Sequence, residues 1–197
     1  MTNIALFGPP GAGKGTQSKE LIQTYQLVHI APGDLLRDQI NQKTALGQQV
    51  AEYINGGRLA PDALVIDIVE AQLAAKNHGD GFLFDGFPRT ATQAKALEET
   101  LERYGMHMDV VVFLEVPEEE LIQRIKSRAG IAGRADDQDE EKIATRMRIY
   151  HDTTLPVAEY YARQHKLVKV CGVGAVDTIF ERIVAAMGEL SVVPTLK

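Results

Sequence analysis

The sequence predicts an α/β fold, a parallel sheet of about five strands with helices on both faces. One observation behind this prediction is a glycine-rich turn over residues 8–16, which follows the apolar run 4–7 and precedes a helical pattern. The other is the alternation of short apolar runs with helical patterns along the rest of the chain, a spacing that favours strand–helix–strand units. In such a sheet, a ligand is expected at the carboxyl ends of the strands.

The glycine-rich turn fits the spacing of a phosphate-binding P-loop, with Gly8, four residues, Gly13 and Lys14. Its backbone N–H groups and the positive end of the following helix are expected to converge on an anion. Gly15 stands where Ser or Thr normally follows the lysine, and Thr16 comes one residue later. The turn therefore predicts a nucleotide-phosphate site in a P-loop NTPase-type sheet, rather than a glycine-rich turn with an incidental lysine.

The first half of the chain continues with elements that apolar spacing predicts. Pro32 near a first helical position and Asp34 in the first turn are ordinary helix-start residues. The helices after the second apolar run are expected to form an insertion. The predicted elements are a helix over 17–25, a strand over 27–30 and helices over 35–42, 45–55 and 62–76.

The second half opens on an apolar strand over 81–85 that ends in Asp85, a Walker B pattern that would place this carboxylate near Mg²⁺. A loop over 129–137 separates two later helices, and the acidic run 136–141 is expected to be a solvated helix N-terminus rather than a metal site. Pro156 is expected to kink or break the second helix. The other predicted elements are a helix over 90–104, a strand over 110–114, a helix from 117, a helix to about 164, a strand over 167–170, a helix over 176–187 and a loose tail from about 189.

The composition indicates a soluble protein. No segment approaches the roughly 18 uninterrupted apolar residues of a membrane span, and no signal-peptide pattern precedes the first strand, so a cytoplasmic protein without a membrane partner is expected. A net charge of −6 gives no general attraction to nucleic acid. The single cysteine, Cys171, allows neither an internal disulfide nor a zinc cluster and is expected to be a buried strand residue. No long apolar face is left unexplained, so a monomer is expected.

Phosphoryl transfer requires mainly positioning and positive charge from a protein. The chain offers Lys14 and several arginines but no obvious Ser–His or Cys–His nucleophile system. An alcohol or water acceptor would need a carboxylate base or an orienting glutamine, whereas the phosphate of a nucleoside monophosphate, with a second pKa near ~6, is already deprotonated at pH 7. The sequence therefore favours a phosphate acceptor, with the helical insertion and the loop 129–137 closing over the substrates to exclude water.

Four motifs carry a resemblance to a known family. They are the P-loop, Pro-Gly-Asp-Leu-Leu-Arg at 32–37, Asp-Gly-Phe-Pro-Arg-Thr at 85–90 with Gln93, and Gly-Arg-Ala-Asp-Asp at 133–137. From Ile4 to about Met187 the chain is similar to the nucleoside monophosphate kinases, and it resembles their adenylate kinase family in a short-lid form. The resemblance implies reversible, Mg²⁺-dependent phosphoryl transfer from ATP to AMP that gives two ADP, by direct in-line transfer without a covalent intermediate.

The same resemblance implies one nucleoside monophosphate kinase domain over residues 1–197. Its core would comprise residues 1–30, 61–126 and 138–197, its NMP-binding insertion residues 31–60, and its short lid residues 127–137. Many bacterial relatives carry a longer lid that sometimes binds zinc. With a short lid and one cysteine, no zinc is expected here.

The resemblance also implies roles for the residues that match the family's motifs. Those expected to act on the transferred group are Lys14, Arg89, Arg128, Arg134 and Arg146. Those expected to hold ATP are Gly11, Ala12, Gly13, Lys14, Gly15, Thr16, Arg124, Arg128 and Gly174. Those expected to hold AMP are Pro32, Arg37, Arg58, Leu59, Ala60, Gly86, Phe87, Pro88, Arg89, Gln93, Arg134 and Arg146. Asp85 would organise Mg²⁺, mainly through water.

One position departs from the family, because Pro32 stands where adenylate kinases usually carry Thr near the acceptor base. Proline offers neither a hydroxyl nor an N–H, so acceptor discrimination rests on other groups or is relaxed. UMP/CMP kinases usually have Asn after the clamp arginine, whereas Thr90 and Gln93 follow the adenylate kinase pattern and favour AMP. The open alternatives are a UMP/CMP or broader nucleoside monophosphate kinase and, more remotely, a non-catalytic nucleotide-binding scaffold, against which the presence of Lys14 argues.

Overall fold

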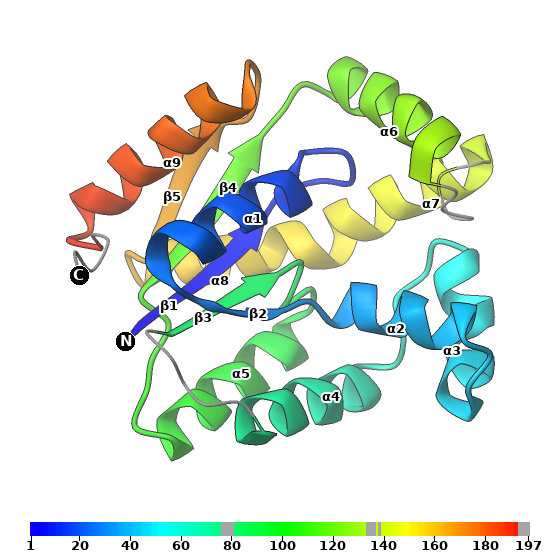
Figure 1. Ribbon diagram of the computed structural model, residues 1–197, viewed down its shortest axis with the longest axis horizontal. Helices are drawn as coiled ribbons and strands as arrows, with labels where there is room; N and C mark the ends of the chain where they lie inside the picture. Colours follow the sequence, from blue (N-terminus) through cyan, green and yellow to red (C-terminus); the bar gives the residue numbers. More distant parts are fainter. Residues whose placement is uncertain (76–80, 133–136, 138, 193–197) are drawn as a thin grey trace.

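The structure, a computed structural model, describes residues 1–75, 81–132, 137 and 139–192, with the backbone alone for 128–132. Within these residues, five parallel strands form one sheet in the order β2-β3-β1-β4-β5 (Figure 1). The strands are β1 (Thr2–Phe7), β2 (Val28–Ile30), β3 (Gly81–Asp85), β4 (Val110–Glu115) and β5 (Leu167–Cys171). The predicted α/β class, with about five parallel strands, is confirmed.

Helices cover both faces of the sheet (Figure 1). Successive side chains of β1 point to opposite faces, so Ala5 and Phe7 enter one hydrophobic cluster and Ile4 and Leu6 enter the other. The helices that pack into the first cluster include α4 (Asp62–Ala75), α5 (Ala91–Arg103) and α8 (Leu155–Arg163). Those that pack into the second include α1 (Lys14–Tyr25) and α9 (Val176–Glu189). This sandwich fixes the strand ends from which the functional loops leave.

Two short helices, α2 (Pro32–Asn41) and α3 (Ala45–Asn55), follow β2 and lie beyond the carboxyl ends of the strands (Figure 1). They approach each other closely at Gly47, where a Cβ would lie 2.0 Å from the backbone oxygen of Gln39. Thr44 caps α3, because its Oγ1 accepts a hydrogen bond from the Gly47 N–H at 3.0 Å. The helical insertion predicted after the second strand is therefore present as a tightly packed helix pair.

Helix α6 (Glu118–Ala132) runs further than the sequence analysis predicted, so the expected loop start at residue 129 is wrong. A lone glycine costs a helix only about 1 kcal/mol, so Gly130 does not end it. Helix α7 (Glu140–Ile149) begins at an Asp139 cap that accepts from the Glu141 N–H at 2.8 Å. The acidic run does form a helix start there, but Asp137 within it is buried rather than solvated.

The helix predicted to reach about residue 164 is interrupted before α8. Residues Tyr150–Thr154 form a π-helical segment, η2, between α7 and α8. Pro156 comes just after η2, so the residue without an N–H stands where the helix changes from π to α hydrogen bonding. The chain therefore shows a π-helical irregularity before Pro156 in place of a full break, and such π segments often mark functional sites.

Cys171 is exposed, so the prediction of a buried cysteine is wrong. Strand β5 lies at an edge of the sheet, and burial along it alternates, with Val168 and Val170 buried while Lys169 and Cys171 face solvent. The apolar residues next to Cys171 in the sequence therefore do not show that Cys171 itself lies on the buried face of the strand. Across the described ranges, no helix has the length and apolar character needed to cross a membrane.

Candidate active site

A cavity of about 560 Å³ opens at the carboxyl ends of β1, β2 and β3, where the sequence predicts a ligand. It is bordered by the glycine-rich turn after β1, the α2–α3 pair, the segment after β3, and helices α6 and α7. The sequence-predicted residues that line it are Gly11, Ala12, Gly13, Lys14, Gly15, Thr16, Arg37, Arg58, Leu59, Asp85, Gly86, Pro88, Arg89, Arg124 and Arg146. One cavity therefore gathers most of the residues named for donor, acceptor and metal.

The glycine-rich turn presents the start of α1 to the cavity. Gly11 has a φ of +85°, and a Cβ there would lie 2.9 Å from the backbone oxygen of Leu121, so only glycine fits. Gly13 occupies the N-cap of α1 and brings no side-chain acceptor to this positive helix end, which suits an anion there. The Lys14 ammonium donates to the backbone oxygens of Gly8 at 2.8 Å and Pro9 at 3.0 Å. The turn therefore has the geometry expected of a phosphate cradle.

Asp85 at the end of β3 is a mostly buried carboxylate that accepts a hydrogen bond from the Ser18 hydroxyl at 2.7 Å. Nε2 of His29 lies 3.5 Å from the same carboxylate oxygen. Burial raises the pKa of Asp85, but the neighbouring His29 imidazole, the hydrogen bond from Ser18 and the charge of Lys14 outweigh burial and hold its pKa below the usual value. Asp85 is therefore ionised at neutral pH, as a Mg²⁺-organising carboxylate requires.

Arg37 from α2 and Arg89 from the segment after β3 meet beside Gly33. A Cβ on Gly33 would lie 3.3 Å from Nη2 of Arg37 and 3.5 Å from Nη2 of Arg89, so both guanidinium groups approach the same point. Arg37 also pairs with Asp34 at 2.5 Å. Nε of Arg89 donates to the backbone oxygen of Gly86 at 2.7 Å. Two planar cations held this way suit a phosphate group.

Three more arginines reach the cavity from other sides. Nε of Arg124 donates to Glu120 at 2.8 Å, and its Nη1 donates to the backbone oxygen of Gly172 at 3.0 Å. Arg58 pairs with a Glu52 oxygen at 2.8 Å. Arg146, largely buried, pairs with the fully buried carboxylate of Asp137. Each arginine is therefore held by protein contacts before any nucleotide binds.

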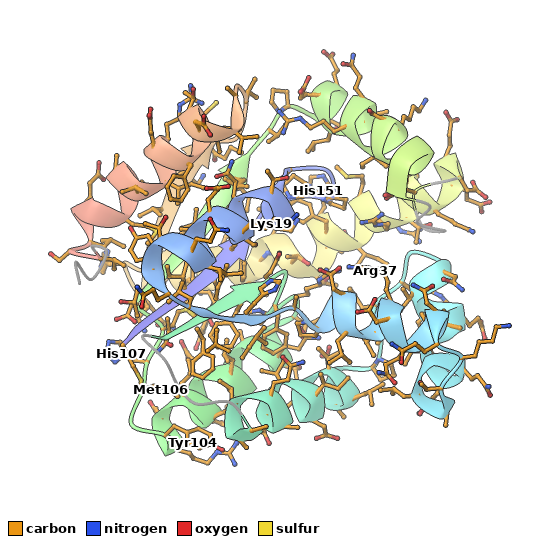
Figure 2. The ribbon with its side chains drawn as sticks, viewed as in Figure 1. Lys19, Arg37, Tyr104, Met106, His107 and His151 are labelled. Atoms are coloured by element: carbon orange, nitrogen blue, oxygen red, sulfur yellow. The ribbon has the colours of Figure 1, made fainter. Side chains whose placement is uncertain are left out.

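Positive charge is concentrated in the cavity although the chain carries a net charge of −6. The described cationic side chains that line it are Lys14, Lys19, Arg37, Arg58, Arg89, Arg124 and Arg146, whereas the lining carboxylates are Asp34 and Asp85. Figure 2 shows two of the cationic residues, Lys19 on α1 and Arg37 on α2. A locally cationic cleft of this kind attracts and holds polyphosphates.

Some predicted site residues do not line the cavity. Pro32, Ala60, Phe87 and Gln93 are buried in the protein, and Gly174 is exposed outside it. The amide of Gln93 is bonded to protein groups instead, because its Nε2 donates to Asp62 and its Oε1 accepts from the Arg89 N–H. Arg134 and the side chain of Arg128 lie outside the described residues.

The sequence analysis missed Lys19, Tyr150 and Thr154, all of which line the cavity. Burial and the charge of Glu115 raise the pKa of Tyr150 to about 12, so its hydroxyl stays protonated. The Thr154 hydroxyl donates to the backbone oxygen of Arg89 at 3.2 Å. Tyr150 and Thr154 both belong to η2, and the sequence carried no signal for a π segment beyond the proline that follows it.

The described residues contain no group of three or more His, Cys, Asp or Glu side chains that could hold a metal ion by themselves. The site fits Mg²⁺ in another way, since this ion is commonly bound through one or two carboxylates together with substrate phosphates and water. Asp85 supplies such a carboxylate, and the Thr16 hydroxyl lines the same cavity.

Comparison with known proteins agrees with this geometry. The family model described as "Adenylate kinase" matches residues 6–166. A protein named "Adenylate kinase" from Porphyromonas gingivalis is 45% identical over 183 residues, which cover 93% of this chain and 94% of that protein. Proteins of the same name from Parabacteroides distasonis and Flavobacterium psychrophilum are 43% and 41% identical over 190 residues, covering 96% of this chain and 100% of each. The chain therefore belongs to the adenylate kinase family of phosphotransferases.

Proposed function

We propose that this member of the adenylate kinase family transfers the terminal phosphoryl group of ATP reversibly to AMP, giving two ADP. The observation that carries the proposal is the cavity in which the phosphate cradle, an ionised Asp85 and arginines from distant parts of the chain meet. The reaction needs stabilisation of negative charge and in-line placement of two phosphates. Both requirements match the groups that line the cavity.

The donor would occupy the side of the cavity formed by the cradle. The N–H groups of residues 11–16 and the Lys14 ammonium would hold the ATP phosphates, and Arg124 would lie against the adenine. Gly174 and Arg128 belong to this proposal through the family resemblance. When bound with ATP, Mg²⁺ would neutralise charge on the phosphates, and Asp85 and Thr16 would hold it, mainly through water.

The acceptor would lie against the α2–α3 pair and the segment after β3. Arg37 and Arg89 would clamp its phosphate, while residues 58–60 and 86–88 would surround the nucleoside. Gln93 belongs to this proposal through the family resemblance. Arg146, with Arg134 and Arg128, would contribute charge at the transferring group. Because the acceptor phosphate is already deprotonated at pH 7, no general base and no covalent intermediate are required.

Closure of two lobes would exclude water from the reaction. We propose residues 31–60 as the acceptor-binding lobe and residues 127–137 as a short lid, within one domain over 1–197. The α2–α3 pair lies at the cavity edge, in a position that suits such motion (Figure 1). Excluding water keeps the donor from being hydrolysed in place of transfer.

We also propose that the protein is a cytoplasmic monomer. Its large exposed apolar side chains are spread along the chain apart from Val173 and Val176, which lie near the start of α9. Among the described residues they are Met1, Tyr53, Tyr104, Val173, Val176 and Leu190. Scattered exposure of this kind needs no partner surface. Sedimentation at micromolar concentration tests the oligomeric state, and a concentration-dependent dimer would contradict it.

The experiment that tests the function is product formation from MgATP with AMP, GMP, UMP and CMP in parallel, with an acceptor-free control. We expect a strong preference for AMP and little ADP without an acceptor. Comparable rates with UMP or CMP would favour the alternative of a broader nucleoside monophosphate kinase and would make Pro32→Thr the next variant. No turnover with any acceptor would favour a nucleotide-binding scaffold.

Arg89→Ala tests the acceptor clamp within the same assay. We expect kcat/KM to fall by about three orders of magnitude, the lower range of arginine-finger effects. Arg163→Ala is the matched control, because Arg163 is exposed on α8 and does not line the cavity. A loss below about fivefold, small against those effects, would remove Arg89 from the clamp.

A further inference from the structure

We propose that Asp62 is a positioning residue for the acceptor site: its carboxylate sets the orientation of the Gln93 amide, and that amide in turn holds the backbone of Arg89. Asp62 is the first residue of α4 and does not line the cavity. The kinetic consequence of this inference rests on the proposed function, in which Arg89 clamps the acceptor phosphate.

Hydrogen bonds through the Gln93 amide connect Asp62 to Arg89, and Thr90 joins the same network. One carboxylate oxygen of Asp62 accepts from Nε2 of Gln93 at 2.8 Å, and the other accepts from the Thr90 hydroxyl at 2.8 Å. Oε1 of Gln93 accepts from the Arg89 N–H at 2.8 Å. The Thr90 hydroxyl oxygen also accepts from the Gln93 N–H at 3.2 Å, as the cap of α5. Asp62, Gln93 and Thr90 therefore form a hydrogen-bonded ring that the backbone between Arg89 and Thr90 closes.

The chemistry of a carboxylate decides which way the amide faces. An ionised carboxylate only accepts hydrogen bonds, so it must face the NH₂ group of Gln93. The amide oxygen is then directed at the Arg89 N–H. A flipped amide would place two acceptors against each other at Asp62 and two donors against each other at Arg89. Gln93 is only 2% exposed, so water is poorly placed to compensate for that loss.

The Gln93 amide is one of the contacts that hold Arg89 in place. Its N–H donates to Gln93, its backbone oxygen accepts from Thr154 at 3.2 Å, and its Nε donates to the backbone oxygen of Gly86 at 2.7 Å. These contacts place its guanidinium beside Gly33 and Arg37. A small misplacement of a group that clamps substrate can greatly reduce the rate. Loosening the hydrogen bond between the Arg89 N–H and Gln93 should therefore weaken acceptor binding more than donor binding.

The first test is amide hydrogen exchange at Arg89, measured by NMR on the full-length protein without nucleotide. Asp62→Ala should speed exchange of this amide about tenfold, the factor that corresponds to one lost hydrogen bond. Asp67→Ala is the matched control, since Asp67 is an exposed residue of the same helix, and it should leave the rate unchanged. A folded Asp62→Ala protein with a wild-type Arg89 rate would overturn the proposal.

Two further variants separate the ring from other effects of Asp62. Asp62→Asn removes the charge but can keep the ring, because its oxygen can accept from Gln93 while its NH₂ donates to the Thr90 hydroxyl. The Arg89 amide of this variant should exchange at close to the wild-type rate. If Asp62→Asn instead speeds exchange as much as Asp62→Ala does, the effect comes from the charge at the start of α4, and the proposal is overturned. Gln93→Leu should speed exchange as Asp62→Ala does. Additive effects in the double variant would show that Asp62 does not act through Gln93.

The kinetic arm uses the forward reaction with MgATP and AMP. Asp62→Ala should raise the KM for AMP about tenfold and leave the KM for ATP within about twofold, a split that general destabilisation would not produce. Equal rises in both constants would overturn the proposal. A wild-type protein that fails to phosphorylate AMP would refute the proposed function instead, while the exchange measurement would still report on the ring.

Discussion

Gly47→Ala tests whether the acceptor site depends on close packing of α2 against α3. A Cβ at Gly47 would lie 2.0 Å from the Gln39 oxygen and 2.6 Å from the Ile40 nitrogen, whereas ordinary contact begins at 3.4 Å. Both contacts are backbone atoms, which no side-chain rotation can relieve, so α2 must move away by about 1.4 Å in a close-packed lobe. Overpacking of this kind costs about 1–3 kcal/mol, which thermal unfolding should register as a lower Tm.

The functional consequence follows from the position of Arg37 on α2. A shift of about 1 Å in a positioning group can cost about a hundredfold, so kcat/KM for AMP should fall by one to two orders of magnitude while the KM for ATP changes little. Gly188→Ala is the control, because nothing lies within 4 Å of its Cβ in α9, and it should be neutral or slightly stabilising. A Gly47→Ala protein with wild-type Tm and wild-type AMP kinetics would refute the reasoning.

Three smaller perturbations test other contacts. Ser18→Ala removes the hydroxyl donor to a buried carboxylate and should lower the free energy of unfolding by about 1 kcal/mol, with exposed Ser127→Ala as the control; equal stability of the two variants would contradict this. Arg124→Ala should raise the KM for ATP about tenfold and leave the KM for AMP nearly unchanged, and the reverse pattern would move Arg124 to the acceptor side. The hydrogen bond from Thr100, with the charge of the neighbouring arginine, lowers the pKa of Glu70 below 4.5. Because the pKa of Glu70 is lowered in the folded protein, wild type should be more stable than Glu70→Gln at pH 7 by less than about 1 kcal/mol. This difference should shrink as the pH drops below 4.5. A difference that grows in acid would show that folding does not lower the pKa of Glu70.

The parts of the fold that could be predicted from sequence are those that local chemistry decides. The apolar run before the glycine-rich turn must be a buried strand, and the turn can serve only as a helix start that binds an anion. Alternating strands and helices then left a parallel sheet as the natural arrangement. The five predicted strands and the helical insertion agree with the structure for this reason.

The parts that could not be predicted depend on contacts between distant residues. Cys171 is exposed at the end of β5, which lies at the edge of the sheet. The residues around Cys171 in the sequence do not indicate which strand takes the edge position. Asp137 looked like a solvated helix-start acid but is buried against Arg146. Thr154 lines the site from a π segment for which the local sequence gives no signal. Each of these outcomes is a tertiary effect that overrides a local pattern.

Glycines in two of the motifs serve the arginines beside them. A Cβ on Gly33 would come within 3.3 Å of Arg37, and one on Gly86 within 3.0 Å of Arg89. Gly86 also has a φ of +64°, a conformation that other residues adopt at a cost. A guanidinium group can lie this close to the backbone only where the residue has no side chain. Glycine and arginine therefore stand a few residues apart in both segments, and this spacing can be recognised as a motif. Asp62 acts over a distance of 31 positions through Gln93, which explains why no local motif includes it although it bears on the same arginine.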